Sequence, residues 1–328
     1  MKLFLALIAS VSCVLGGVDG VVMNGTTGQP QPNVIITMVQ PGAGGMQTLA
    51  TVKSDAQGIF KIEERVPPGP VLLQAIYGAV IYTKMLPPGS PTNNLDLQVF
   101  DATTNPESGK VAQDMILLEP GPGGIAVTET ILCNNATKQT FEDPKNGSVR
   151  FFVAEAARGN IQVTVSSPNG MPIQRPAEKT KSKGVYKVDY ALKPGETRFD
   201  IAYSLPAGDT FRGERIDAGT PLRLVTPGSV TLSGDGVDML GQEPQTQARI
   251  YDVKNASYAV KIEGTGSLRS TDASAQGEQD DGHPQVESDA ARIYTQKTFA
   301  VSDFYWVLGL AFAVLGLGGV MLYRKGAA

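Results

Sequence analysis

The sequence predicts an all-β fold made of tandem β-sandwich domains, followed by a single transmembrane helix near the C-terminus. Three observations lead to this prediction. Short β-branched runs, each about the length of one strand, recur along the chain and are separated by turn residues. Glycine and proline are frequent, with 37 and 22 residues among 328, as expected of a chain with many turns. Before residue 304, no long segment has the apolar periodicity of a helix.

The N-terminus has the pattern of a secretory signal peptide, which we place at residues 1–17. One lysine precedes an uncharged, mostly apolar run from Leu3 to Leu15, and this order is typical of such signals. The run is shorter than the ~20 residues that a membrane span needs. The small residues Gly16 and Gly17 favour cleavage there, while acylation of Cys13 and an uncleaved anchor remain alternatives.

Residues 18–119 form the first predicted β domain. Explicit turn sequences, such as Asn24-Gly25 and Pro67-Pro68-Gly69, separate its apolar runs. The predicted strands are Gly20–Met23, Val34–Gln40, Leu49–Lys53, Ile59–Ile62, Val71–Tyr77, Val80–Met85, Leu95–Phe100 and Gln113–Leu118.

Two motifs in this domain occur at a familiar spacing. A Gly-x-Pro-x-Pro loop containing Gly28 and Pro32 precedes a strand, and the pattern Asp-x-x-Gly-x-Phe follows with Asp55, Gly58 and Phe60. In both motifs, residues 18–119 resemble the carboxypeptidase regulatory-like domain. The resemblance implies a transthyretin-like β-sandwich, which is also grouped with carbohydrate-binding-like folds. It does not imply peptidase activity, because a fold does not determine a function.

Physical chemistry predicts that the signature residues make the fold rather than a ligand site. Asp55 can accept hydrogen bonds from the backbone of its turn. Gly58 can adopt a positive φ between two paired strands, and Phe60 is expected to point into the core. Ser54 stands where the family most often has threonine.

Residues 120–124, Pro-Gly-Pro-Gly-Gly, are the clearest predicted domain boundary, because they carry no apolar side chain and their prolines disfavour regular structure. We therefore predict a linker there and a second β-sandwich-like region at residues 125–263. Its predicted strands are Ile125–Leu132, Val149–Val153, Ile161–Ser166, Val185–Ala191, Arg198–Tyr203, Leu222–Val225, Arg249–Val253 and Tyr258–Ile262.

The C-terminal part predicts a stalk and a membrane span. Residues 264–303 are polar and poor in apolar side chains, so we predict a disordered stalk. The segment from Phe304 to Tyr323 is uncharged and begins with an aromatic cluster, which predicts a transmembrane helix. Basic residues in the tail at 324–328 place it in the cytoplasm. The expected protein is thus a single-pass membrane protein with an extracytoplasmic ectodomain, in the periplasm or at the cell surface.

Small residues on one face of the predicted span suggest a possible dimer contact. Gly309, Ala313 and Gly316 occur at helical spacing, and small side chains let two spans approach closely.

The composition offers little for catalysis or nucleic-acid binding. The net charge of −4 gives no basic patch for nucleic acid. The chain has one histidine, His283, in the predicted stalk, which does not suit metal or Ser-His chemistry. Cys133 ends an apolar run and is predicted to be a small buried hydrophobe. We therefore predict no catalytic, cofactor-binding or metal-binding residues, and no cofactor.

The leading hypothesis is a non-catalytic, membrane-tethered interaction or structural protein of the cell envelope, bacterial by the family resemblance. One alternative is a carbohydrate-binding module, with Tyr77 and Tyr82 as tentative ligand contacts. Sugar sites are often aromatic platforms, and the only tryptophan, Trp306, lies in the predicted span. A second alternative is an accessory subunit of an envelope or transport complex. The partner outside the cytoplasm is thus expected to be a protein or a glycan.

Overall fold

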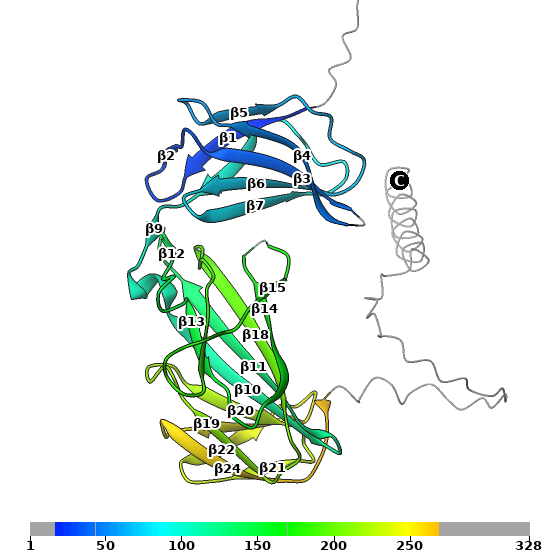
Figure 1. Cartoon of the computed structure of the whole chain (residues 1–328), viewed down its shortest axis with the longest axis vertical. Helices are drawn as coiled ribbons and strands as arrows, with labels where there is room; N and C mark the ends of the chain where they lie inside the picture. The colour runs from blue at the N-terminus through cyan, green and yellow to red at the C-terminus, as the bar shows by residue number, and fades with distance from the viewer. Residues whose placement is uncertain (1–16, 43, 169, 269–328) are drawn as a thin grey trace, which may run out of the picture. The chain divides into compact units, whose positions relative to one another are not determined.

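Two hydrophobic cores organise the part of the chain that the computed structural model describes, residues 17–42, 44–168 and 170–268 (Figure 1). Nearly all regular elements in these residues are β-strands, and the one short helix there is the 3-10 helix η1 (Pro106–Gly109). The predicted all-β fold of β-sandwich character is therefore confirmed for the described residues. Most predicted strands recur within a few residues, and Ile59–Ile62, Val71–Tyr77 and Arg249–Val253 coincide with β5, β6 and β23.

The first core lies between two four-stranded sheets. One has the order β4-β3-β6-β7, and in the other β1 pairs with β2, β5 and β8. All pairs are antiparallel except β1 with β8. The strands are β1 (Val18–Asn24), β2 (Gln29–Pro30), β3 (Ile35–Gly42), β4 (Gly45–Lys53), β5 (Ile59–Ile62), β6 (Val71–Tyr77), β7 (Val80–Leu86) and β8 (Leu95–Val99).

The signature residues of the first sandwich build its turns and core. Asp55 Oδ1 accepts hydrogen bonds from the backbone N–H groups of Gln57 (2.9 Å) and Ile59 (2.8 Å). Gly58 has a φ of +75°, and Phe60 is fully buried. These side chains therefore act on the fold, as their residue types predicted.

The loop before β3 is fastened to the same turn. The buried Ser54 Oγ accepts from the N–H of Val34 and donates to the carbonyl of Gln31, both at 2.9 Å. Gly28 turns the chain between β1 and β2 with a φ of +72°, and Pro32 lies in the turn that leads into β3.

Gly58 gives a first testable prediction. A Cβ atom there would lie 2.8 Å from the carbonyl oxygen of Val22, whereas Gly89 has a similar φ of +79° and open space around it. We expect Gly89→Ala to cost about 1–2 kcal/mol through backbone strain alone, and Gly58→Ala to cost clearly more. Urea denaturation of the two variants measures this difference, and equal losses would contradict the steric argument.

The second core is covered by an eight-stranded sheet with the order β15-β14-β18-β11-β10-β20-β23-β22 and by two three-stranded sheets, β13-β17-β16 and β19-β24-β21. β10 pairs parallel with β20, and the other pairs are antiparallel. The strands are β10 (Val111–Gly121), β11 (Gly124–Asn135), β13 (Val149–Phe152), β14 (Arg158–Ser166), β15 (Ile173–Arg175), β16 (Glu178–Lys179), β17 (Val185–Val188), β18 (Gly195–Leu205), β19 (Thr210–Glu214), β20 (Leu222–Thr226), β21 (Thr231–Ser233), β22 (Val237–Gln242), β23 (Arg249–Val253) and β24 (Ser257–Glu263).

The predicted linker at residues 120–124 is instead a hairpin turn inside the second sandwich. β10 and β11 stay paired up to Gly121 opposite Gly124, so β10 belongs to the second core. Gly124 lies so close to the carbonyl of Leu205 that a Cβ atom would be 2.2 Å from its oxygen. Proline and glycine shape tight turns as readily as linkers, and for this reason composition alone misplaced the boundary. Phe100 still packs against the first core and Val111 already packs against the second, so the chain passes between the cores from one residue to the other.

The first residues of the predicted stalk, 264–268, are instead bonded to the second sandwich. The N–H of Gly266 donates to the carbonyl of Pro120 at 3.0 Å, and the N–H of Leu268 donates to Glu119 Oε1 at 2.8 Å. Residues 264–268 are thus attached to the β10–β11 hairpin.

Several predictions fall outside the described residues. They concern the signal peptide with Cys13, the rest of the stalk with His283, the span from Phe304 to Tyr323 and its face of Gly309, Ala313 and Gly316. Within the described residues, no helix is long and apolar enough to cross a membrane.

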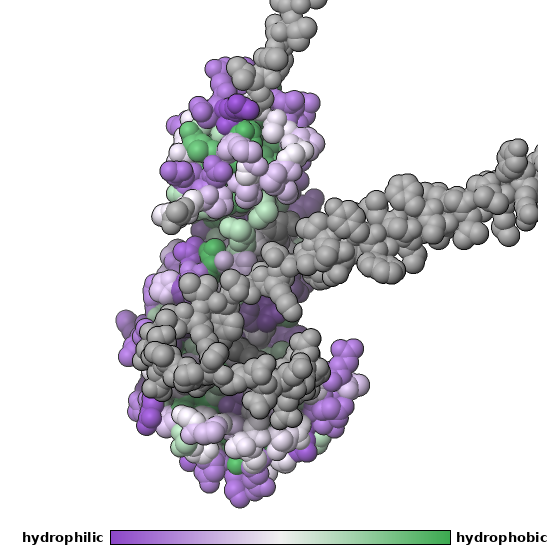
Figure 2. Space-filling model, turned by 90° about the vertical axis from the view of Figure 1, so that its right-hand side faces the viewer, coloured by the Kyte–Doolittle hydropathy of each residue, from purple (hydrophilic) through white to green (hydrophobic). Residues whose placement is uncertain are grey.

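The described surface is mainly polar, with separate apolar patches that appear green in Figure 2. Eight large hydrophobic residues in this part of the chain are exposed: Met46, Ile59, Ile81, Met85, Met171, Ile173, Met239 and Leu240.

Candidate ligand-binding cleft

Both cores belong to one compact unit, and direct contacts join them. β9 (Ala102–Thr103) pairs parallel with β12 (Thr140–Phe141). Ala191, from the second sandwich, packs against the first core. The surfaces on either side of this junction are therefore held together by backbone and side-chain contacts.

Tyr82 is part of this junction rather than an exposed platform. Its side chain is 6% exposed, and its hydroxyl bonds to the carbonyl of Phe100 (2.9 Å) and to Thr140 Oγ1 (2.8 Å). The hydroxyl of the partly buried Tyr77 donates to Asp101 Oδ1 at 2.8 Å. Tyr82 therefore offers little exposed ring surface to a sugar, and its hydroxyl already has partners. Ligand contact by Tyr77 and Tyr82 stays a prediction.

Removing the Tyr82 hydroxyl tests the junction. Tyr82→Phe leaves the fully buried Thr140 hydroxyl without this partner, which we expect to lower the free energy of unfolding by about 1–2 kcal/mol. Urea denaturation followed by circular dichroism measures the loss. Ser233→Ala, on an exposed position of β21, serves as the control and should change little. If Tyr82→Phe left the free energy of unfolding unchanged, this contact would not stabilise the junction.

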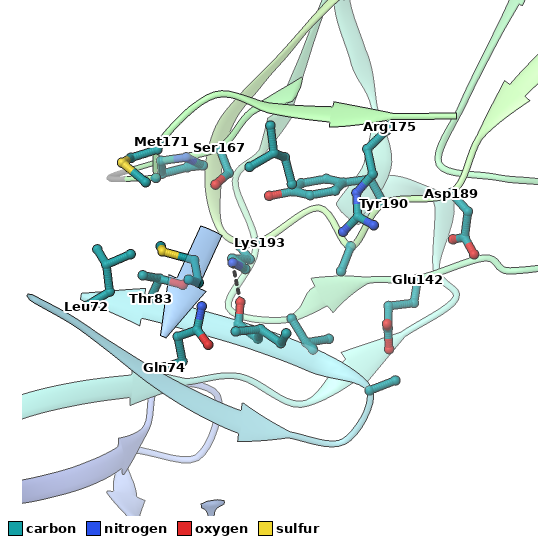
Figure 3. A pocket seen from close by; sticks show the side chains of 18 of the residues that line it. Leu72, Gln74, Thr83, Glu142, Ser167, Met171, Arg175, Asp189, Tyr190 and Lys193 are labelled. Atoms are coloured by element: carbon teal, nitrogen blue, oxygen red, sulfur yellow. Dashed lines mark hydrogen bonds between the residues drawn. The ribbon is translucent and has the colours of Figure 1, made fainter. Parts of the chain in front are cut away.

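A cleft of about 430 Å³ opens beside the junction, between the β6–β7 hairpin of the first sandwich and the β14–β15 region of the second (Figure 3). Residues from both sandwiches line it: Met46, Leu72, Gln74, Ala79, Val80, Ile81, Thr83 and Met85 from the first, and Glu142, Pro144, Ser167, Pro168, Gly170, Met171, Ile173, Arg175, Asp189, Tyr190, Ala191 and Lys193 from the second.

Exposed apolar side chains are concentrated in this cleft. It contains five of the eight exposed large hydrophobic residues of the described chain, namely Met46, Ile81, Met85, Met171 and Ile173. Methionine is flexible and polarizable, so it adapts to ligands of different shape. An exposed apolar surface rimmed by polar residues is typical of an interaction site.

Two cations face the cleft from the second sandwich. Lys193 Nζ donates to the carbonyl oxygen of Ile81 at 2.6 Å and lies 5.3 Å from the centroid of the Tyr82 ring. Burial lowers the pKa of Lys193 to about 8, and the charge of Arg175 adds to this effect. The Arg175 guanidinium lies 5.4 Å from the Tyr190 ring centroid. Among the described residues, neither cation forms an ion pair with a carboxylate.

Two carboxylates, Glu142 and Asp189, also line the cleft. Partial burial raises the pKa of Glu142, and the nearby charge of Asp189 raises it further. Figure 3 shows both carboxylates on one side of the view and the Lys193 amine near its centre. The cleft therefore presents apolar, cationic and anionic regions to a ligand.

A second cavity, of about 640 Å³, adjoins β7. It is lined by residues of β6, β7 and β8, including Ala75, Tyr82, Lys84 and Leu97. Thr83, Met85, Pro168, Gly170 and Lys193 line both cavities.

The second core holds a buried pair of carboxyl groups away from the cleft. Glu129, on β11, is fully buried and shares a hydrogen bond with Asp114 on β10. Burial raises the pKa of both groups, that of Asp114 to about 7.

Burial also raises the pKa of the Cys133 thiol to about 12, and the prediction of a small buried residue there is confirmed. Within the described residues, no group of three His, Cys, Asp or Glu side chains is placed to hold a metal ion.

Sequence reasoning missed the cleft and the carboxyl pair. Lys193 stands in Lys193-Pro194-Gly195-Glu196, which reads as an ordinary turn. The one available signal for the pair was a glutamate at an inward position of the apolar run Ile125–Leu132.

No family model matches the chain, and no curated protein matches it. Among solved structures, the chain is similar to an M1 zinc metallopeptidase from Deinococcus radiodurans, with a TM-score of 0.24 and 11% identity over 46% of this chain and 42% of that one. It is also similar to BcpA, the major pilin subunit of Bacillus cereus, with a TM-score of 0.20 and 11% identity over 75% of this chain and 67% of that one. The chain thus spans less than half the length of the metallopeptidase. Similarities this low carry no conclusion about activity.

Proposed function

We propose that this protein is a non-catalytic, membrane-tethered interaction protein outside the cytoplasm, and that it binds its partner in the cleft beside the junction. The concentration of exposed Met and Ile side chains in that cleft supports the proposal most strongly. Lys193 and Arg175 add to it, since neither forms an ion pair with a carboxylate in the part of the chain that the structure describes. The membrane tether and the export rest on the sequence patterns at the two ends.

We also propose that the first sandwich is of the carboxypeptidase regulatory-like kind. The turn built by Asp55 and Gly58 and the buried Phe60 support this assignment. A sugar-binding role is less well supported, because Tyr82 is buried and the Arg175 guanidinium lies over the face of the Tyr190 ring. An accessory role in an envelope complex agrees with the same cleft and differs only in the partner.

Site-specific photo-crosslinking in the full-length protein tests the proposal. A benzophenone amino acid replaces Ile81 in the cleft or, as the matched control, Leu240 on β22, which is similarly exposed and does not line the cleft. Irradiation in native membranes should give a discrete adduct from position 81 and none of that size from position 240. Equal labelling from both positions, or hydrolase activity of the purified protein, would contradict the proposed function.

A further inference from the structure

The outer side of β7 is an open sheet edge. β7 is the last strand in the order β4-β3-β6-β7, and no strand of the described chain pairs with its outer side. With seven residues, β7 is longer than most edge strands that proteins leave unprotected. An open edge carries unpaired backbone N–H and C=O groups and can accept another strand.

The register shows which residues of β7 offer these groups. β7 pairs antiparallel with β6, with Tyr77 opposite Val80 at the turn and Ala75 opposite Tyr82. The Ile81 carbonyl accepts from Lys193 Nζ and therefore points away from β6. Since backbone groups alternate sides along an antiparallel strand, the N–H and C=O groups of Thr83 and Met85 also point outward.

The two cavities adjoin this edge and share Thr83 and Met85 of β7. Leu72 and Ile81 line only the 430 Å³ cleft, whereas Ala75 and Tyr82, from the core face of the sheet, line only the 640 Å³ cavity. A strand added beside β7 would direct successive side chains to opposite faces. One set of its side chains would lie on the side of Leu72 and Ile81, and the other set on the side of Ala75 and Tyr82.

Lys193 indicates the charge of the incoming strand. Its side chain is half-buried, its amine is close enough to Arg175 to sense that charge, and the Ile81 carbonyl is its hydrogen-bond partner. A strand that pairs with Ile81 would bring its own N–H to that carbonyl and displace the amine. A carboxylate on the strand would then neutralise Lys193, forming a charge-assisted hydrogen bond. The carboxylates Glu142 and Asp189 in the cleft, and Asp96 in the second cavity, restrict a ligand carboxylate to the region of the two cations.

From this geometry we propose that β7 binds an extended segment of a partner protein by strand addition, with apolar side chains alternating along the segment and a carboxylate placed at Lys193 and Arg175. The inference rests on the proposed function, and it names the class of partner that the cleft accepts.

A library of displayed random ten-residue peptides, selected against the full-length protein, supplies the probe. Synthetic copies of the selected peptides are then N-methylated on every second residue, in two complementary sets. A strand pairs with β7 through alternate residues only. One methylated set should therefore lose at least about tenfold in affinity, as expected when backbone hydrogen bonds are removed, while the other binds like the parent. Equal effects of both sets would overturn strand addition.

Variants of the protein test the same geometry. Thr83→Pro removes an outward N–H that no ladder bond uses, and proline is tolerated at such edge positions, so the variant should keep its melting curve and lose peptide binding. Lys193→Met should lower the affinity for carboxylate-bearing peptides about tenfold. It should leave the affinity for their amide analogues unchanged. Lys53→Met, on the opposite edge strand β4 of the same sheet, is the matched control and should not change binding.

The outcomes separate the two proposals. A discrete adduct at Ile81, combined with peptides that bind equally to wild type and Thr83→Pro, would overturn strand addition and leave the interaction function standing. An Ile81 adduct formed with a second copy of this chain, or with its own C-terminal segment, would overturn the assignment to a separate partner protein. If no position-specific adduct formed at Ile81, the proposed function itself would be contradicted.

Discussion

The free energy of unfolding is expected to fall by roughly 4 kcal/mol as the pH rises from about 4 to about 8, because the folded protein buries the Asp114–Glu129 pair. Burial raises the pKa of Asp114 from an ordinary value of 3.8 to about 7, and the charge of Asp217 adds to this effect. Burial likewise raises the pKa of Glu129 well above its usual range. In the unfolded chain both groups ionise near pH 4.

The sign of the effect follows from proton binding. Between about pH 4 and pH 7 the folded protein holds protons that the unfolded chain has released, so stability decreases with rising pH throughout this window. Below about pH 4 both states are protonated. Above about pH 8 Asp114 is ionised in both states, so its contribution levels off, while the raised pKa of Glu129 acts in the same direction. Asp114 Oδ1 and Glu129 Oε2 are buried and have no hydrogen-bond partner among the described residues, which makes their ionised forms costly.

Urea denaturation of the full-length protein at a series of pH values, followed by circular dichroism, measures this dependence. The isosteric double variant Asp114→Asn, Glu129→Gln should lose most of the slope between pH 4 and pH 8. Replacing the exposed carboxylates Glu64 and Asp96 by amides gives a control that should keep it. A wild-type protein that is equally stable at pH 4.5 and pH 8 would show that the pair is not buried as described.

Phe60→Ala is expected to destabilise the protein by about 3–5 kcal/mol, the usual cost of removing a buried phenylalanine. Phe60 is 1% exposed and packs in the first core with Val22, Ile36 and Leu73. The substitution removes the apolar contact area and leaves a cavity that the surrounding strands cannot fully close.

The neighbouring residue provides the matched control. Ile59 is on the same strand, is 53% exposed, and its side chain points to the opposite face of the sheet. Ile59→Ala should therefore change the free energy of unfolding by less than about 0.5 kcal/mol. If both variants were equally stable, or if Phe60→Ala impaired peptide binding without affecting stability, the fold-making role of the signature residue would be wrong.

Local patterns in the sequence predicted most of the strands but missed several short ones. β5, β6 and β23 coincide with β-branched runs bounded by turn residues. β19, β21 and β22 were not predicted. β21 has only three residues, and the alternation in β19 and β22 is interrupted by glycine and charged residues. Their positions depend on pairing with β24 and β23, which are distant contacts that no local pattern contains.

The domain boundary shows the same limit. A Pro-Gly segment can separate two domains or close one hairpin, and the choice depends on whether the flanking strands pair. The pairing of β10 with β11 and of β11 with β18 placed residues 120–124 inside the second sandwich.

The sequence by itself determined the all-β class, most strands and the roles of Asp55, Gly58 and Phe60, because these depend on residue type and on neighbours along the chain. Only the tertiary structure decided what surrounds Tyr82, Lys193 and the Asp114–Glu129 pair. The partners of these groups come from strands far away in the sequence. Burial, charge and access at a site are set by such distant partners, and the candidate cleft therefore became visible only when the two sandwiches were placed together.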